Sequence, residues 1–200
     1  VFARHFAKQG AKIALLGRSE LPPASEWAAH LKRFGEHERV SRQILQLQQL
    51  QKLGAKVLVL QADVAIDMEL EHARANILQE FGSIDAVLHT AGILRDGPLL
   101  TKTFAECEEV FTPKVHGTEA LYRLLSPHNL KLFAVFSSTS AAIAPAGQVD
   151  YVAANTYLNS FMQHAALRAR HHGSRTRYIA VGWGIWADAG MAHEQVSGPT

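Results

Sequence analysis

Residues 132–138 read Leu-Phe-Ala-Val-Phe-Ser-Ser, and residues 151–155 read Tyr-Val-Ala-Ala-Asn. The apolar part of the first stretch predicts a buried strand, and the second opens a helical pattern that places Tyr151 and Asn155 on one face. Parallel α/β sheets bind their ligands at the carboxyl ends of their strands. A serine at the end of one strand and a tyrosine at the start of the next helix can converge there on one substrate oxygen. Ser138 and Tyr151 are therefore candidate site residues.

The rest of the chain alternates between short apolar runs and helical patterns, with no internal repeat. This alternation predicts an α/β fold, a Rossmann-like doubly wound parallel sheet with right-handed crossovers. Pro113 lies inside a helical pattern over 104–125 and is expected to kink or split it. The expected strands are Lys12–Leu16, Lys56–Leu60, Ile84–His89, Leu132–Phe136 and Tyr178–Val181. The other expected helices are Val1–Gln9, Val40–Leu53, Met68–Phe81 and Tyr151–His171.

Composition places the chain among ordinary globular domains. It has 200 residues, 48% hydrophobic and 19% charged, with a formal net charge of +2. We therefore expect one domain over 1–200, without a nucleic-acid footprint and without a membrane span or signal peptide. The single Cys107 excludes an intrachain disulfide and suits a reducing, cytoplasmic location. Within the domain, residues 20–38 are interpreted as a polar surface insertion and residues 187–200 as the start of a lid over substrate.

Several separated motifs resemble a known family. The spacing from Ser138 to Tyr151 is similar to that of short-chain dehydrogenases/reductases, but Asn155 stands where those enzymes usually carry lysine. A lysine occurs instead at Lys114, in Thr-Pro-Lys-Val-His-Gly over 112–117. This exchange, with Ala-Gly-Gln at 146–148 and Gly-Trp-Gly-Ile-Trp at 182–186, resembles the ketoreductase domain of modular type I polyketide synthases and animal-type fatty acid synthases. The resemblance runs from about Gly10 to Met191.

The resemblance implies reduction of a β-ketoacyl thioester by NADPH to the β-hydroxyacyl thioester. The substrate would be carried by the phosphopantetheine of an acyl carrier protein, with other synthase domains as neighbours. Tyr151 would act as general acid, and Ser138 would donate a hydrogen bond to the developing alkoxide. Lys114 would lower the pKa of Tyr151 and hold the ribose hydroxyls of the cofactor. Asn155 would orient Lys114 and a water molecule.

The resemblance also implies a set of cofactor-binding residues. Arg18, after the first expected strand, would meet the 2′-phosphate of NADPH; otherwise it is a surface arginine. Asp63 and Val64 would contact the adenine; otherwise Asp63 is a helix N-cap or turn aspartate. The remaining members of the set, besides Lys114, follow two other strands: Ala91, Gly92, Gly182 and Trp183. A Gly-x-Gly-x-x-Gly turn does not occur in the 200 residues, and we expect that turn and the strand before it to precede Val1.

Asp96 is the candidate for substrate orientation. One group of related ketoreductases carries Leu-Asp-Asp where this chain has Leu94-Arg95-Asp96, and the opposing group carries tryptophan where this chain has Ile143. The resemblance to the first group implies a D-configured β-hydroxyl, although Arg95 departs from its pattern.

Two other functions stay open, namely a non-catalytic reductase-like module of a synthase and a free-standing short-chain reductase. The presence of all four catalytic residue types counts against the first. Asn155 in place of lysine, and the Gly-Trp-Gly stretch, count against the second. No metal site is expected, because His164, His171 and His172 lie at a helix end without a cysteine or carboxylate at ligand spacing.

Overall fold

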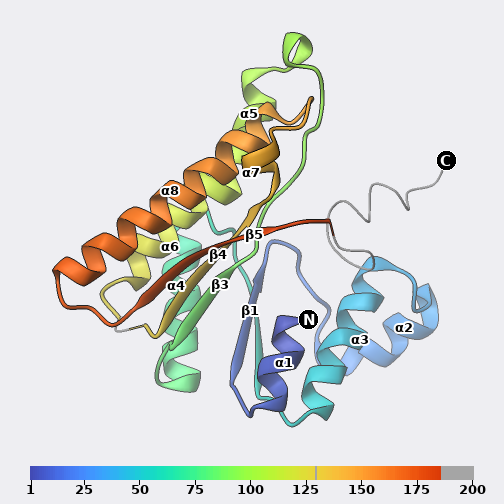
Figure 1. Ribbon diagram of the computed structural model, residues 1–200. Coiled ribbons are helices and arrows are strands. Elements are labelled where there is room, and N and C mark those ends of the chain that lie inside the picture. The colour runs from blue at the N-terminus through green and yellow to red at the C-terminus, as the bar shows by residue number, and fades with distance from the viewer. Residues whose placement is uncertain (129, 186–200) are drawn as a thin grey trace. The chain divides into compact units, whose positions relative to one another are not determined.

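The computed structural model describes residues 1–128 and 130–185, which form two compact units (Figure 1). The first consists of Val1–Asp63 with Glu71–Ser83, and the second consists of Val64–Leu70 with the chain from Ile84 onward. Each unit contains its own parallel sheet. The lid expected over 187–200 lies outside the described residues.

The first unit is built on strands β1 (Ile13–Gly17) and β2 (Val57–Gln61), which pair in parallel. A small core centred on Ala7, Leu50 and Ala55 packs beside these strands. Residues 20–38, interpreted as an insertion, contain a short helix, and the Trp27 indole N–H donates to Pro22 O at 2.8 Å. The helices of this unit are α1 (Phe2–Lys8), η1 (Ala24–Glu26), α2 (Trp27–Phe34), α3 (Arg39–Lys52) and most of α4 (Asp67–Phe81).

The second unit carries three parallel strands in the order β3-β4-β5, namely β3 (Ala86–His89), β4 (Leu132–Ser138) and β5 (Arg177–Trp183). In β4 the side chains of three successive residues from Phe133 are buried, as in parallel strands that are covered on both faces. The remaining elements of this unit are η2 (Leu99–Thr101), α5 (Phe104–Phe111), η3 (Thr112–His116), α6 (Gly117–Leu125), α7 (Ser140–Ile143) and α8 (Val149–His171). Figure 1 shows α8 running along this sheet, with α5 and α6 close to it.

The helical stretch over 104–125 neither breaks nor splits at Pro113. A capping box of Thr103 and Glu106 starts α5. The chain then passes through one π-helical turn, η3, into α6. There the Gly117 N–H donates to Thr112 O, five residues back. The wider turn accommodates the proline and leaves Lys114 in the middle of the π-helix.

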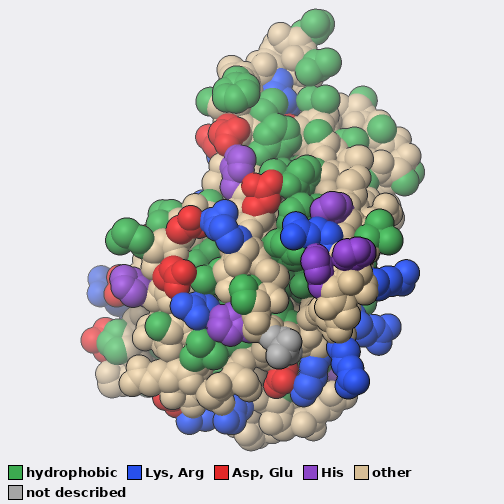
Figure 2. Space-filling view, turned by 90° about the vertical axis from the view of Figure 1, so that its left-hand side faces the viewer, with side chains coloured by type: hydrophobic (Ala, Val, Ile, Leu, Met, Phe, Trp, Pro, Cys, Tyr) green, Lys and Arg blue, Asp and Glu red, His purple; other side chains and the backbone are tan. Residues whose placement is uncertain are grey.

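The strands confirm the predicted α/β fold with parallel sheets. Within the described residues, β1 pairs only with β2, and β3 only with β4. No described helix is long and apolar enough to cross a membrane. Acidic and basic side chains both occur on the face drawn in Figure 2, with hydrophobic ones between them.

Candidate active site

Ser138 and Tyr151 lie together at the carboxyl edge of the three-stranded sheet. Ser138 is the last residue of β4, where it pairs in register with Trp183 of β5. Tyr151 lies in the first turn of α8. Burial raises the pKa of the Tyr151 phenol, hydrogen bonding from the Ser138 and Asn155 side chains lowers it, and the charge of Asp96 raises it again. The net shift is upward, so the phenol holds its proton at neutral pH.

Lys114 approaches Tyr151 from η3. Its side chain is 3% exposed, and Nζ donates to Phe136 O of β4 at 3.0 Å. Nζ also lies 5.3 Å from the centre of the Tyr151 ring, a cation–π distance. Burial lowers the pKa of Lys114 to about 8. Desolvation of the phenol dominates the pKa of Tyr151, and the predicted lowering of that pKa by Lys114 stays a prediction.

Asn155 completes this group. It is fully buried one helical turn after Tyr151, and its Nδ2 donates to Tyr151 O at 2.7 Å. Its Oδ1 has no hydrogen-bond partner among the described residues. A buried, unsatisfied amide oxygen is costly, so it marks a place for a donor such as water or a ligand hydroxyl. Among the described residues no hydrogen bond joins Asn155 to Lys114, and its predicted orienting role stays a prediction.

His89 is hydrogen-bonded to the π-helix. It ends β3, is 5% exposed, and its Nε2 donates to Pro113 O at 2.9 Å. Burial, with the Lys114 charge as a smaller contribution, lowers the pKa of His89 to about 4, so the ring is neutral. In an α-helix, Pro113 O would accept the N–H of Gly117, but the π-turn directs that N–H to Thr112 O. The sequence showed His89 only as the end of a strand.

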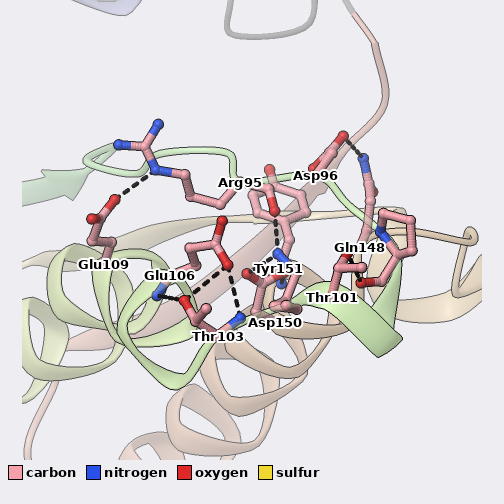
Figure 3. Close-up of polar contacts among 11 residues, drawn as sticks. Arg95, Asp96, Thr101, Thr103, Glu106, Glu109, Gln148, Asp150 and Tyr151 are labelled. Atoms are coloured by element: carbon pink, nitrogen blue, oxygen red, sulfur yellow. Dashed lines mark hydrogen bonds and ion pairs between the residues drawn. The ribbon is translucent and has the colours of Figure 1, made fainter.

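The loop after β3 is bonded to the segment that leads into Tyr151 (Figure 3). The Asp96 carboxylate accepts from Gln148 Nε2 at 2.8 Å, and Gly97 N donates to Gly147 O at 2.9 Å. Gly147 has a φ of +82°, a conformation that suits glycine. Asp96, predicted to orient substrate, therefore lies at this junction.

A buried ion pair joins the same two segments. Lys102 Nζ lies 2.7 Å from Asp150 Oδ2, and the two side chains are 2% and 0% exposed. Hydrogen bonding to Asp150 is the main cause that raises the pKa of Lys102. The sequence alone does not indicate this pair. The two residues are 48 positions apart, and an acid in a first helical turn is common enough to carry no signal by itself.

The predicted cofactor residues fall in both units. Arg18 and Asp63 follow the carboxyl ends of β1 and β2 in the first unit. Val64 belongs to the second unit, where it packs against the hydrophobic core. Gly182 and Trp183 end β5 beside Ser138, and Ala91 and Gly92 follow β3. The predicted contacts of these residues with the cofactor stay predictions.

The residues of the second unit fit a nicotinamide cofactor. The Lys114 ammonium has three N–H groups, of which one is used by Phe136 O among the described residues. Asn155 Oδ1, which has no hydrogen-bond partner among the described residues, lies on α8 one helical turn after Tyr151. Buried donors and acceptors with remaining capacity are what the hydroxyl groups of a ribose require.

Comparison with known proteins gives concordant matches. A family model described as the KR domain matches residues 1–188. Polyketide synthase PksL of Bacillus subtilis (strain 168) is 33% identical over 195 residues, which cover 94% of this chain and 4% of that synthase. A solved ketoreductase domain from the bacillaene assembly line matches with a TM-score of 0.80 at 29% identity, over 95% of this chain and 42% of that one. An N-terminal ketoreductase from the macrolactin assembly line matches with a TM-score of 0.76 at 32% identity, over 93% and 34%.

Proposed function

Because this chain belongs to the KR-domain family, the ketoreductase domains of polyketide synthases, we propose that it reduces a β-ketoacyl thioester to a β-hydroxyacyl thioester. The substrate is bound to an acyl carrier protein, and the reductant is NADPH. Domains of this family use a nicotinamide cofactor, which supplies the hydride to the ketone carbon. The observation that carries the proposal is the grouping of Ser138, Tyr151, Asn155 and the buried Lys114 at one sheet edge.

The protein's part in the reaction is to position the ketone and supply a proton. Tyr151 keeps its phenolic proton, because its pKa is raised, and donates it to the ketone oxygen as hydride arrives. Ser138 donates a hydrogen bond to the same oxygen. Lys114, whose pKa is about 8, is protonated at pH 7 and able to return a proton to the phenolate.

Replacement of Tyr151 tests the proposal directly. In the full-length protein, Tyr151→Phe is expected to lower the rate of thioester reduction by roughly 100-fold or more, while NADPH binding is retained. Tyr157→Phe is the matched control, since it removes a phenol from the same helix that is hydrogen-bonded to Glu119. Equal losses in both variants, or loss of NADPH binding in Tyr151→Phe, would point to a structural tyrosine and to a non-catalytic module.

Preference for NADPH over NADH rests on Arg18, because a guanidinium pairs with a 2′-phosphate and no acid stands at the end of β1. Arg18→Ala is expected to raise KM for NADPH and leave KM for NADH nearly unchanged. Wild-type protein that uses both cofactors equally would contradict this part of the proposal.

A further inference from the structure

The loop over residues 95–102 has little apolar packing to hold it in place. Leu99 is 67% exposed and Leu100 is 98% exposed. The ion pair between Arg95 and Glu109 joins side chains that are about half exposed, and exposed pairs contribute little. The position of this loop therefore depends on its polar contacts.

Three of those contacts join the loop to the segment just before Tyr151, and one joins the two ends of the loop. Asp96 is bonded to Gln148, and Gly97 to Gly147. Lys102 bonds the Arg95 carbonyl oxygen and, through the buried ion pair, Asp150. Asp150 Oδ1 in turn accepts from Tyr151 N at 2.8 Å (Figure 3). The Lys102 ammonium thus connects Arg95, at the start of the loop, to Asp150, which in turn accepts from the Tyr151 backbone N–H.

We propose that Lys102 and Asp150 form a clamp that holds the Asp96 loop against the start of α8 and so fixes the side from which the substrate reaches Tyr151. This inference rests on the proposed ketoreduction for its second half only. Lys102 and Asp150 are positioning residues, because they act through the loop and through the Tyr151 backbone. The capping box directly after Lys102 fixes the start of α5 and with it the base of the lysine side chain.

Hydrogen exchange of the full-length protein tests the clamp without any need for activity. In Lys102→Met, the Gly97 amide is expected to exchange roughly tenfold faster or more, because its bond to Gly147 O loses its support. Glu109→Gln breaks the exposed ion pair of the same loop and is the matched control, with unchanged exchange expected. Unchanged Gly97 exchange in Lys102→Met would overturn the clamp.

Loss of the clamp must be separated from general unfolding. Lys102→Met leaves Asp150 buried without its ionic partner, so Lys102→Met/Asp150→Asn is made in parallel. Asparagine keeps an acceptor for Tyr151 N and removes the unpaired charge. In the double variant, the β4 amides are expected to exchange as slowly as in wild type. The Gly97 amide is expected to exchange as fast as in Lys102→Met. Restored protection of Gly97 in the double variant would overturn the clamp.

Product stereochemistry tests the second half of the inference. An N-acetylcysteamine β-ketoacyl thioester is reduced by each variant, and the products are resolved by chiral chromatography. Wild type and Glu109→Gln are expected to give mainly the D-hydroxy product, and both clamp variants a mixture. A product ratio that does not change in the clamp variants would show that the clamp does not fix the side from which the substrate reaches Tyr151. Absence of reduction in wild type, with Gly97 exchange still dependent on Lys102, would refute the proposed function and leave the clamp standing.

Discussion

At the scale of single residues, burial shifts the pKa values of Lys114 and Tyr151 in opposite directions. The pKa of Lys114 falls to about 8 and that of Tyr151 rises, each because desolvation disfavours its charged form. Both groups are consequently protonated at pH 7. As pH rises through 8, Lys114 loses its proton before Tyr151 does. At neutral pH, Lys114 is therefore an ammonium and Tyr151 is a neutral phenol rather than a phenolate.

The lowered pKa of Lys114 has a consequence for stability. Between pH 8 and pH 10.5 the unfolded chain binds more protons at this lysine than the folded chain, so wild-type stability rises with pH in that window. Below pH 8 the full cost of burying the charge is present, on the order of 3 kcal/mol. Lys114→Met is therefore expected to be more stable than wild type at pH 7, with a difference that shrinks towards pH 10.5. Urea unfolding at several pH values measures this difference, with the exposed Lys131→Met as control. A difference that is independent of pH would contradict the prediction.

His89 offers a second prediction at this scale. Glutamine can place an N–H near the position of Nε2, whereas asparagine is too short to reach Pro113 O. His89→Gln is expected to keep most of the activity, and His89→Asn to lose roughly tenfold or more in kcat, because a displaced π-turn moves Lys114. Steady-state kinetics of the two variants gives the comparison. Equal activity in both would show that the bond to Pro113 O does not position Lys114.

At the scale of elements, most helices and strands could be predicted from the sequence. The apolar run from Leu132 and the periodic residues after Tyr151 each gave the right type of element, because their patterns match the way they are buried. The π-helix could not be predicted. Pro113 indicates only that a helix is disturbed, and the donor that binds the freed carbonyl, His89, comes from a strand 24 positions away. The short helix α7 was likewise not predicted.

The joint between η3 and α6 depends on close packing at Gly117. A Cβ atom there would lie 2.7 Å from Val64 Cγ2, shorter than real contacts allow. Gly117→Ala is expected to lower the free energy of unfolding by about 1–3 kcal/mol. Val64→Ala removes the obstructing methyl groups, so Gly117→Ala/Val64→Ala is expected to recover part of that loss. Thermal unfolding of the three variants gives the coupling, and strictly additive losses would contradict it.

At the scale of the whole molecule, the sequence placed the catalytic candidates better than the cofactor contacts. Ser138, Tyr151 and Lys114 come from three elements of one unit, and the family spacing predicts their approach. The buried pair of Lys102 and Asp150 was beyond such reasoning, because only the folded loop brings the two charges together. Arg18 lies in the other unit, so its role depends on the relative placement of two units that local patterns do not specify.

The strand pairing predicts how the 200-residue polypeptide behaves when it is produced alone. Within the described residues, β1 and β3 each have one edge without a partner strand, and unpaired edges expose backbone donors and acceptors. The 200 residues also contain no Gly-x-Gly-x-x-Gly turn, whose backbone N–H groups bind a pyrophosphate. We therefore expect residues 1–200 alone to bind NADPH at least roughly 100-fold more weakly than a polypeptide that also carries such a turn, because the turn supplies these donors. Titration of NADPH fluorescence with both proteins measures the ratio. Equal affinities would mean that residues 1–200 supply the pyrophosphate contacts by themselves.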